Sequence, residues 1–121
     1  MKSGFLIFVA VVSILYGIGN LLIPAWMNEI HGVASSSGTS LLSRYFGASL
    51  LGVGVMAWLA RNAADSDALR AFMRGGLVIA VAGLGVSLHA MTVGIMNALG
   101  WVVVILQAVL SIGFVRFAFM K

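Results

Sequence analysis

The chain has 121 residues, of which 62% are hydrophobic and 8% are charged, and its mean hydropathy is +1.14. Soluble domains are about 45–50% apolar and about 25% charged, so one soluble core cannot bury this much apolar surface. The composition predicts a single membrane domain over residues 1–121, with the lipid bilayer as its first partner. The chain has no cysteine, which excludes disulfides and thiolate chemistry.

The formal net charge of +4 also raises the question of nucleic acid as a partner. The Lys and Arg residues separate hydrophobic runs and form no basic patch with interleaved aromatic side chains, which nucleic-acid binding would require. In a membrane protein this pattern indicates topology signals and contact with anionic lipid headgroups. We therefore expect no nucleic-acid partner.

The apolar runs predict an all-α fold, an antiparallel bundle of four transmembrane helices. A run of about twenty residues extends about 30 Å as a helix, which is enough to cross a bilayer. Lys2 before the first run also fits a signal peptide, but the run exceeds the usual apolar core of about 7–15 residues, so we expect a retained span. The predicted spans are residues 4–23, 41–60, 77–97 and 101–120.

Signals for helix ends lie between these runs. Pro24 suits the first position of a short interfacial helix over residues 24–30 in the first outer loop, and Gly32 suits its stop. Thr39 and Ser40 are candidate N-caps of the second span. Asp65 or Ser66 is the candidate cap of a third helix that begins before the bilayer. A tight turn is predicted at residues 98–100.

The distribution of positive charge predicts the orientation. In a four-span arrangement Arg44 alone falls on one side of the membrane. The positive-inside rule therefore places both termini in the cytoplasm. The residues on the cytoplasmic side are Lys2, Arg61, Arg70, Arg74, Arg116 and Lys121.

Small residues line one face of the predicted third span. They recur at spacings of three and four, which lets a neighbouring helix approach closely. Ala48 and Gly52, four residues apart in the second span, allow the same approach, and the first span has Ala10, Ser13, Gly17 and Asn20 on one face. The set in the third span, here called the seam, is Gly76, Ala80, Gly83, Ser87, Ala90 and Gly94.

Polar residues of the four spans fall at similar depth. At about 1.5 Å per residue from each midpoint, four of them come within roughly 5 Å of the midplane, and three others lie about a turn further out. Such a set is the one candidate for a ligand or proton path. This predicted polar layer consists of His89, Gln107, Tyr16, Ser49, Asn20, Arg44 and Thr92.

Alternatives stay open for the two strongest members of the polar layer. His89 is the ionisable residue deepest in the predicted membrane region, and it can be a structural histidine bonded to Gln107 or Tyr16, a proton or ligand group, or a metal or haem ligand. Arg44 either extends to the outer surface as an anchor or lines a vestibule that attracts an anion. We predict no metal site and no cofactor.

The sequence does not predict an enzyme. Glu29, Asp65 and Asp67 fall in loops or at helix ends, so the membrane region has no carboxylate. A carboxylate pair, a catalytic triad and a metal cluster all need groups that this region lacks.

Three sequence elements carry a resemblance to a known group. They are the Pro24 end of the first span, the block RYFGASLLGVGVMAWLAR (44–61) and the turn MNALGW (96–101). Together they resemble small bacterial four-helix membrane proteins that are similar to DoxX-like proteins. The resemblance implies a four-helix bundle in the bacterial inner membrane and assigns no catalytic or binding residue.

Two functions remain open from the sequence. The first is a structural or accessory module that associates with itself or with a larger membrane complex. The alternative is a small channel or transporter for protons, anions or a small ligand, with a path through the polar layer.

Overall fold

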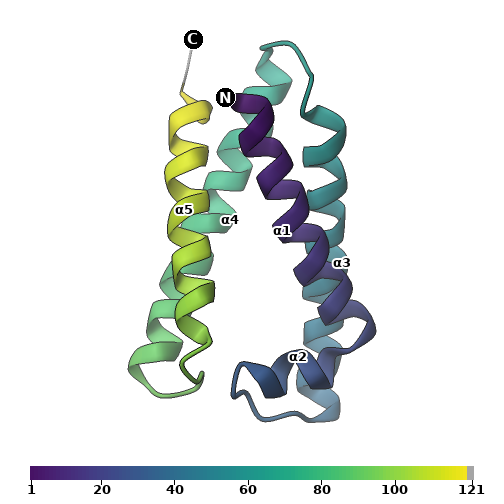
Figure 1. Cartoon of the computed structure of the whole chain (residues 1–121), viewed down its shortest axis with the longest axis vertical. Coiled ribbons are helices and arrows are strands. Elements are labelled where there is room, and N and C mark those ends of the chain that lie inside the picture. Colours follow the sequence, from purple (N-terminus) through teal and green to yellow (C-terminus); the bar gives the residue numbers. More distant parts are fainter. Residues whose placement is uncertain (120–121) are drawn as a thin grey trace. The chain divides into compact units, whose positions relative to one another are not determined.

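The computed structural model describes residues 1–119, which form five helices and no strand. All except α2 are long and apolar enough to cross a membrane, so the predicted all-α fold with four potential membrane spans is confirmed. The end of the predicted fourth span, residues 120–121, lies outside the described residues. The helices are α1 (Lys2–Leu22), α2 (Pro24–Ile30), α3 (Ser37–Ala60), α4 (Asp67–Thr92) and α5 (Gly100–Ala118) (Figure 1).

The helices belong to two compact units. The first unit, Met1–Asn62, contains α1, α2 and α3, and the second unit, Ala63–Lys121, contains α4 and α5. Each unit is built around one pair of long helices, α1 with α3 and α4 with α5.

The contact between α1 and α3 brings the two backbones together. A Cβ atom added to Gly17 would lie 2.7 Å from the Leu51 nitrogen and 2.9 Å from the Gly47 oxygen. A Cβ atom added to Gly54 would lie 3.1 Å from the Ile14 nitrogen. Only glycine permits this approach, because any side chain here would meet backbone. The small residues predicted on one face of the first span, Ala10, Ser13, Gly17 and Asn20, are all buried.

The small residues of α3 that make this contact differ from the predicted ones. Gly47 and Gly54 lie against α1, whereas Ala48 and Gly52 are exposed. A Cβ atom added to Gly52 would meet no atom within 4 Å. The reason is rotation about the helix axis. Successive residues differ by about 100°, so the Ala48–Gly52 face points away from the Gly47–Gly54 face.

A sharp break separates α1 from α2. Ile23 ends α1 with φ −132° and ψ 57°, and its N–H still donates to the Gly19 oxygen. The residue before a proline avoids the helical region, and Pro24 then takes the first position of α2, as predicted. Gly32 follows α2 with φ 76°, a conformation in which glycine has no steric penalty.

The start of α3 lies four residues before the predicted second span. Ser36 is the N-cap, and its Oγ accepts a hydrogen bond from the Thr39 backbone N–H at 3.1 Å. The Thr39 Oγ1 accepts in return from the Ser36 N–H at 2.7 Å, which completes a capping box. Thr39 and Ser40, the predicted N-caps, are therefore already inside the helix.

The second unit begins as the sequence predicts but its first helix ends early. Ser66 caps α4 by accepting from the Leu69 N–H at 3.1 Å. The helix stops at Thr92, because Gly94 takes φ 75° and the Ile95 N–H donates back to the Ala90 oxygen at 2.9 Å. This is a Schellman motif with glycine at its left-handed position. Gly94 is thus a helix stop rather than a member of a helical seam, and the predicted turn at 98–100 begins at Val93.

The remaining seam residues face α5. Gly76 lies against the Phe114 ring, and a Cβ atom added to Gly83 would lie 2.8 Å from the Gln107 Nε2. Gly100, the first residue of α5, lies against the side chains of Met91 and Met96. Of the seam, Gly76, Ala80 and Ser87 are buried, and Gly83 and Ala90 are half-buried.

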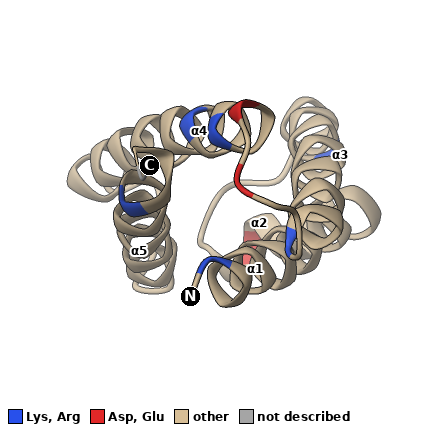
Figure 2. Ribbon diagram, turned by 90° about the horizontal axis from the view of Figure 1, so that it is seen from above, with Lys and Arg blue, Asp and Glu red and all other residues tan. Residues whose placement is uncertain are grey.

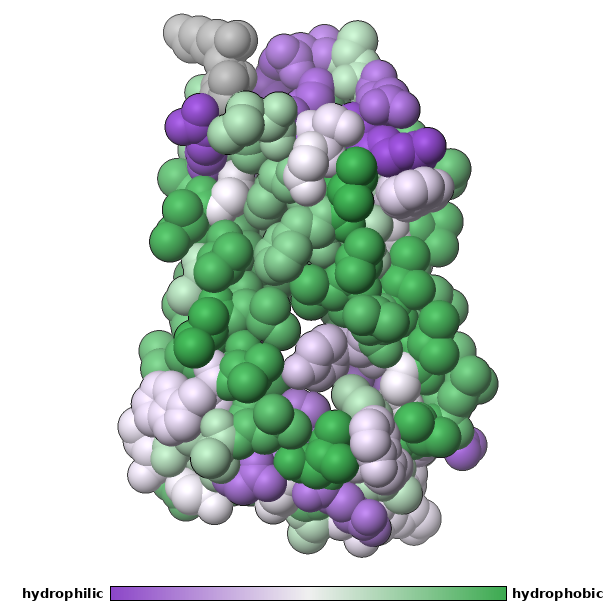
Figure 3. Space-filling model, viewed as in Figure 1, coloured by the Kyte–Doolittle hydropathy of each residue, from purple (hydrophilic) through white to green (hydrophobic). Residues whose placement is uncertain are grey.

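Each unit has an apolar exterior. Exposed side chains on the long helices include Val78, Val86, Ile105 and Ile112, and Figure 3 shows hydrophobic residues over the middle of the helices with hydrophilic residues toward their ends. In the second unit residues 75–115 contain no Asp, Glu, Lys or Arg. Its described charged residues lie just before α4, in the first turns of α4 and near the end of α5 (Figure 2).

Candidate functional site

A polar contact in the first unit joins Tyr16 of α1 to His31, the residue that follows α2. His31 is 8% exposed, and its Nδ1 lies 2.8 Å from the Met27 backbone oxygen. A carbonyl oxygen only accepts, so Nδ1 carries the proton and donates. In the neutral ring Nε2 is then an acceptor, and it lies 3.4 Å from the Tyr16 Oη. The two ring centroids are 5.8 Å apart.

Three features of the chain position this pair. Asn20, one turn after Tyr16, is buried and its Nδ2 donates to the Tyr16 backbone oxygen at 2.9 Å. The break at Pro24 folds α2 back toward α1. Gly19 leaves room for Met27, since a Cβ atom on Gly19 would lie 2.8 Å from the Met27 Sδ. Met27 is one helical turn before His31 and thus supplies both the packing and the acceptor.

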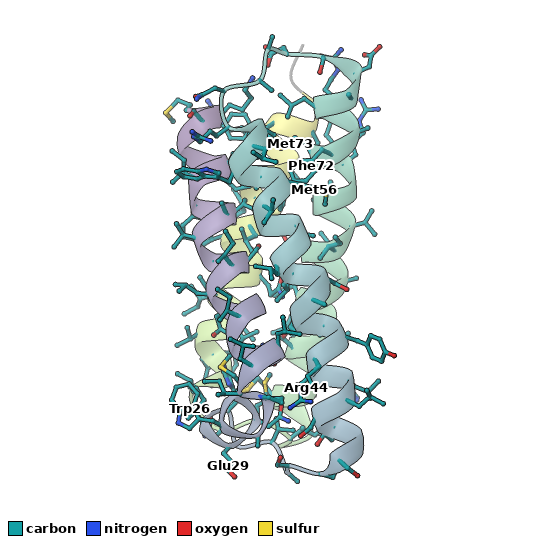
Figure 4. The ribbon with its side chains drawn as sticks, turned by 90° about the vertical axis from the view of Figure 1, so that its right-hand side faces the viewer. Trp26, Glu29, Arg44, Met56, Phe72 and Met73 are labelled. Atoms are coloured by element: carbon teal, nitrogen blue, oxygen red, sulfur yellow. The ribbon has the colours of Figure 1, made fainter. Side chains whose placement is uncertain are left out.

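A second polar contact joins α2 to α3. The Ser43 Oγ donates to the Asn28 Oδ1 at 3.2 Å, while the Asn28 Nδ2 is buried with no hydrogen-bond partner among the described residues. An amide rotated by half a turn would present Nδ2 to Ser43 instead. Figure 4 shows Arg44 on α3 near this end of the unit, with Trp26 and Glu29 on the outer side of α2.

Of the polar layer, the first unit holds four residues and brings two together. Tyr16 and Asn20 share the hydrogen bond described above. Ser49 is exposed, and its Oγ donates to the Tyr45 backbone oxygen of the same helix at 3.0 Å. Arg44 is exposed on α3.

The second unit separates its members of the polar layer. The Gln107 side chain packs against Gly83 inside the α4–α5 contact, and the Ser111 Oγ donates to the Gln107 backbone oxygen at 2.7 Å. His89 is exposed on the opposite face of α4, where Thr92 donates to the His89 backbone oxygen at 2.8 Å. A hydrogen bond between His89 and Gln107, which the sequence suggested as one role for this histidine, is therefore not formed.

The sequence interpretation does not single out His31, which directly follows the predicted short helix over residues 24–30. One signal could have found it. Pro24 predicts the start of a short helix, and in such a helix residues 27 and 31 lie one turn apart on one face. Burial of Met27 against α1 then requires burial of His31 as well.

The chemistry available at this site is proton donation and acceptance. Neutral His31 accepts at Nε2 from the Tyr16 hydroxyl, and protonated His31 would donate there instead. No group of three or more His, Cys, Asp or Glu side chains that could hold a metal ion occurs within residues 1–119.

Comparisons with known proteins add no assignment. The chain matches no protein-family model, no curated protein and no solved structure. The resemblance to DoxX-like proteins therefore stays a prediction that rests on the sequence.

Proposed function

We propose that the chain is a multi-pass protein of the bacterial inner membrane that acts as a structural or accessory module, by association with copies of itself or with a larger membrane complex. In this proposal the four long helices form one antiparallel bundle, both termini are cytoplasmic and α2 lies at the outer interface. The location follows from the DoxX-like resemblance, and the orientation follows from the Lys and Arg distribution. Trp26, exposed on α2, suits the interfacial position.

The observation that carries the proposal is a set of small residues that lie outside the α1–α3 and α4–α5 contacts. Cβ atoms added to Gly52, Gly75 or Gly85 would meet no atom within 4 Å. Glycine inside a helix lowers helix stability by about 1 kcal/mol relative to alanine. These glycines therefore do not serve the stability of their own helix. Gly75, Ala82 and Gly85 share one exposed face of α4, and Ala48 and Gly52 share one exposed face of α3. Such faces allow close approach of a further helix in a bilayer.

The proposal includes no catalytic activity and no bound cofactor. Glu29 is exposed on α2, and the carboxylate of Asp67 pairs with Arg70 at 2.6 Å. Glu29 lies two residues before His31, but neither carboxylate is hydrogen-bonded to Tyr16 or His31. The contact is therefore a fixed polar link between α1 and α2 in this proposal.

Cysteine cross-linking tests self-association directly, because the natural chain has no cysteine. We expect Gly85→Cys to form a disulfide-linked dimer in native membranes under mild oxidation. Ile112→Cys, at a side chain that is 72% exposed on α5, is the matched control and should stay monomeric. Equal cross-linking at both positions would reflect random collision and contradict the proposal.

A steric variant separates contact from chance proximity. Gly85→Ile should shift the protein toward smaller species in mild detergent, while Gly85→Ala should leave its size unchanged. A monomer for the wild-type chain in both bilayer and detergent would exclude self-association and leave a partner protein as the remaining form of the proposal. Co-purification with no other protein would then exclude the accessory role.

Transport is the second candidate, and the contact of the buried His31 with Tyr16 favours it. A histidine that exchanges donor and acceptor roles with a tyrosine can relay a proton. Reconstituted protein would then carry protons or small anions across liposomes, and His31→Phe or His89→Phe would abolish the flux. Flux equal to that of empty liposomes under several gradients would exclude this alternative.

A further inference from the structure

We propose that the arginine-bearing end of the second unit is a contact surface for anionic phospholipid headgroups, with Arg74 and Arg116 as its two principal contacts. The proposal rests on the membrane placement above, and it does not depend on self-association. The partner is defined by its chemistry: a phosphate-bearing headgroup with net negative charge at the end of an apolar acyl region.

The first argument is the charge distribution along the unit. Residues 75–115 contain no charged side chain, so both flanking arginines lie where the apolar surface ends. The α4–α5 register, in which Gly76 lies against Phe114, brings the beginning of α4 and the end of α5 to the same end of the unit. In a bilayer this end lies at the depth of the lipid phosphates.

The second argument is that the structure orients Arg74 and leaves most of its donors available. The Arg74 Nε–H donates to the Ala118 oxygen at 3.2 Å, and the guanidinium carbon lies 5.2 Å from the centre of the Phe119 ring. This bond satisfies a carbonyl at the end of α5. The terminal nitrogens of Arg74, an exposed residue, have no hydrogen-bond partner among the described residues, and a guanidinium binds phosphate well through these donors.

The third argument compares the arginines of this unit. Arg70 is paired with Asp67 at 2.6 Å, so its charge is already compensated. Arg116 is exposed and lies 5.7 Å from the Phe117 ring, with no carboxylate partner among the described residues. Arg74 and Arg116 are thus the two arginines of the described part of the unit that have no carboxylate partner. Beside them, Ile112 and Val115 provide exposed apolar surface for acyl chains.

Electron spin resonance of the full chain in phosphatidylcholine vesicles tests the proposal. Trace spin-labelled phosphatidylglycerol or phosphatidylcholine reports which lipid associates with the protein surface, as a ratio of association constants. For the wild-type chain we expect a ratio in favour of the anionic lipid. Arg74→Gln and Arg116→Gln should each lower this ratio about fivefold relative to the wild type, and the double variant should have no preference. High salt should weaken the preference.

Two control variants make the result specific. Arg74→Lys keeps the charge and should retain most of the preference; a loss as large as that of Arg74→Gln would show that Arg74 only caps α5 and would overturn the proposal. Arg70→Gln removes an arginine of the same unit whose charge Asp67 already compensates, and it should change the ratio little. An equal fall for Arg70→Gln would indicate an effect of net charge alone and would also overturn the proposal.

Two further measurements separate lipid binding from free-phosphate binding and from loss of helical structure. Inorganic phosphate at constant ionic strength should not reduce the preference; full competition would identify a site for free phosphate and overturn the lipid assignment. Circular dichroism should show unchanged helix content in each variant. A lipid preference that is absent from the wild-type chain while Gly85→Cys still cross-links would refute this inference and leave the proposed function standing.

Discussion

The two units use glycine in different ways. In the first unit Gly17, Gly47 and Gly54 let the backbones of α1 and α3 meet. In the second unit Gly76 and Gly83 receive side chains, the Phe114 ring and the Gln107 amide. A backbone cannot move without moving its helix, whereas a side chain can change rotamer. The first unit should therefore tolerate added volume less well than the second.

The largest effect should come from a methyl group at the α1–α3 contact. A Cβ atom added to Gly47 would lie 2.6 Å from the Gly17 oxygen and 2.6 Å from the Leu21 nitrogen. We expect Gly47→Ala to lower the free energy of unfolding in micelles by about 3 kcal/mol. Gly52→Ala, five residues further on with open space around it, should be neutral or stabilising by up to about 1 kcal/mol. Equal losses in the two variants would contradict the backbone contact.

An intermediate effect should appear in the second unit. Gly76→Ala directs a methyl group at the Phe114 ring, and we expect a loss of about 1–2 kcal/mol as the ring shifts. Phe114→Leu should recover much of this loss in the double variant, because the smaller side chain removes the clash. Thermal unfolding of both single variants and the double variant measures the coupling between the two positions. A coupling of zero would mean that the two side chains do not meet.

The smallest effect should come from the polar contact between α1 and α2. Tyr16→Phe removes one hydroxyl and with it the hydrogen bond to His31, so we expect a loss of about 0.5–1 kcal/mol. Tyr45→Phe is the matched control, since Tyr45 is 67% exposed and should show no change. The same pair of variants followed by histidine NMR should shift the His31 resonance only for Tyr16→Phe.

The spacing of small residues predicted those contact faces that a helix defines through its own sequence. The small face of α1 and most of the seam on α4 follow from spacings of three and four, and both lie at the helix contacts. Ser66 as a cap and Pro24 as a first helical residue follow from local chemistry. These features depend on the residues within a turn or two of each position.

The sequence interpretation was incomplete where a partner helix decides and wrong where the backbone decides. Along α3 both Gly47–Gly54 and Ala48–Gly52 form small faces, and only the position of α1 selects between them. Gly94 continued the small-residue spacing, but its ability to adopt positive φ made it the end of α4. His31 required the fold-back of α2, which spacing within the four long runs does not encode.

The early end of α4 has a consequence for bilayer thickness. Between the last arginine and the Schellman motif, residues 75–92 extend about 27 Å at 1.5 Å per residue, and residues 101–115 of α5 extend about 22 Å. A typical hydrocarbon core is about 30 Å thick. A short apolar length is accommodated by local thinning of the lipid, which sorts proteins toward thinner membranes. Because one glycine with a left-handed backbone ends α4 at about 27 Å, we expect the second unit to match a bilayer slightly thinner than average.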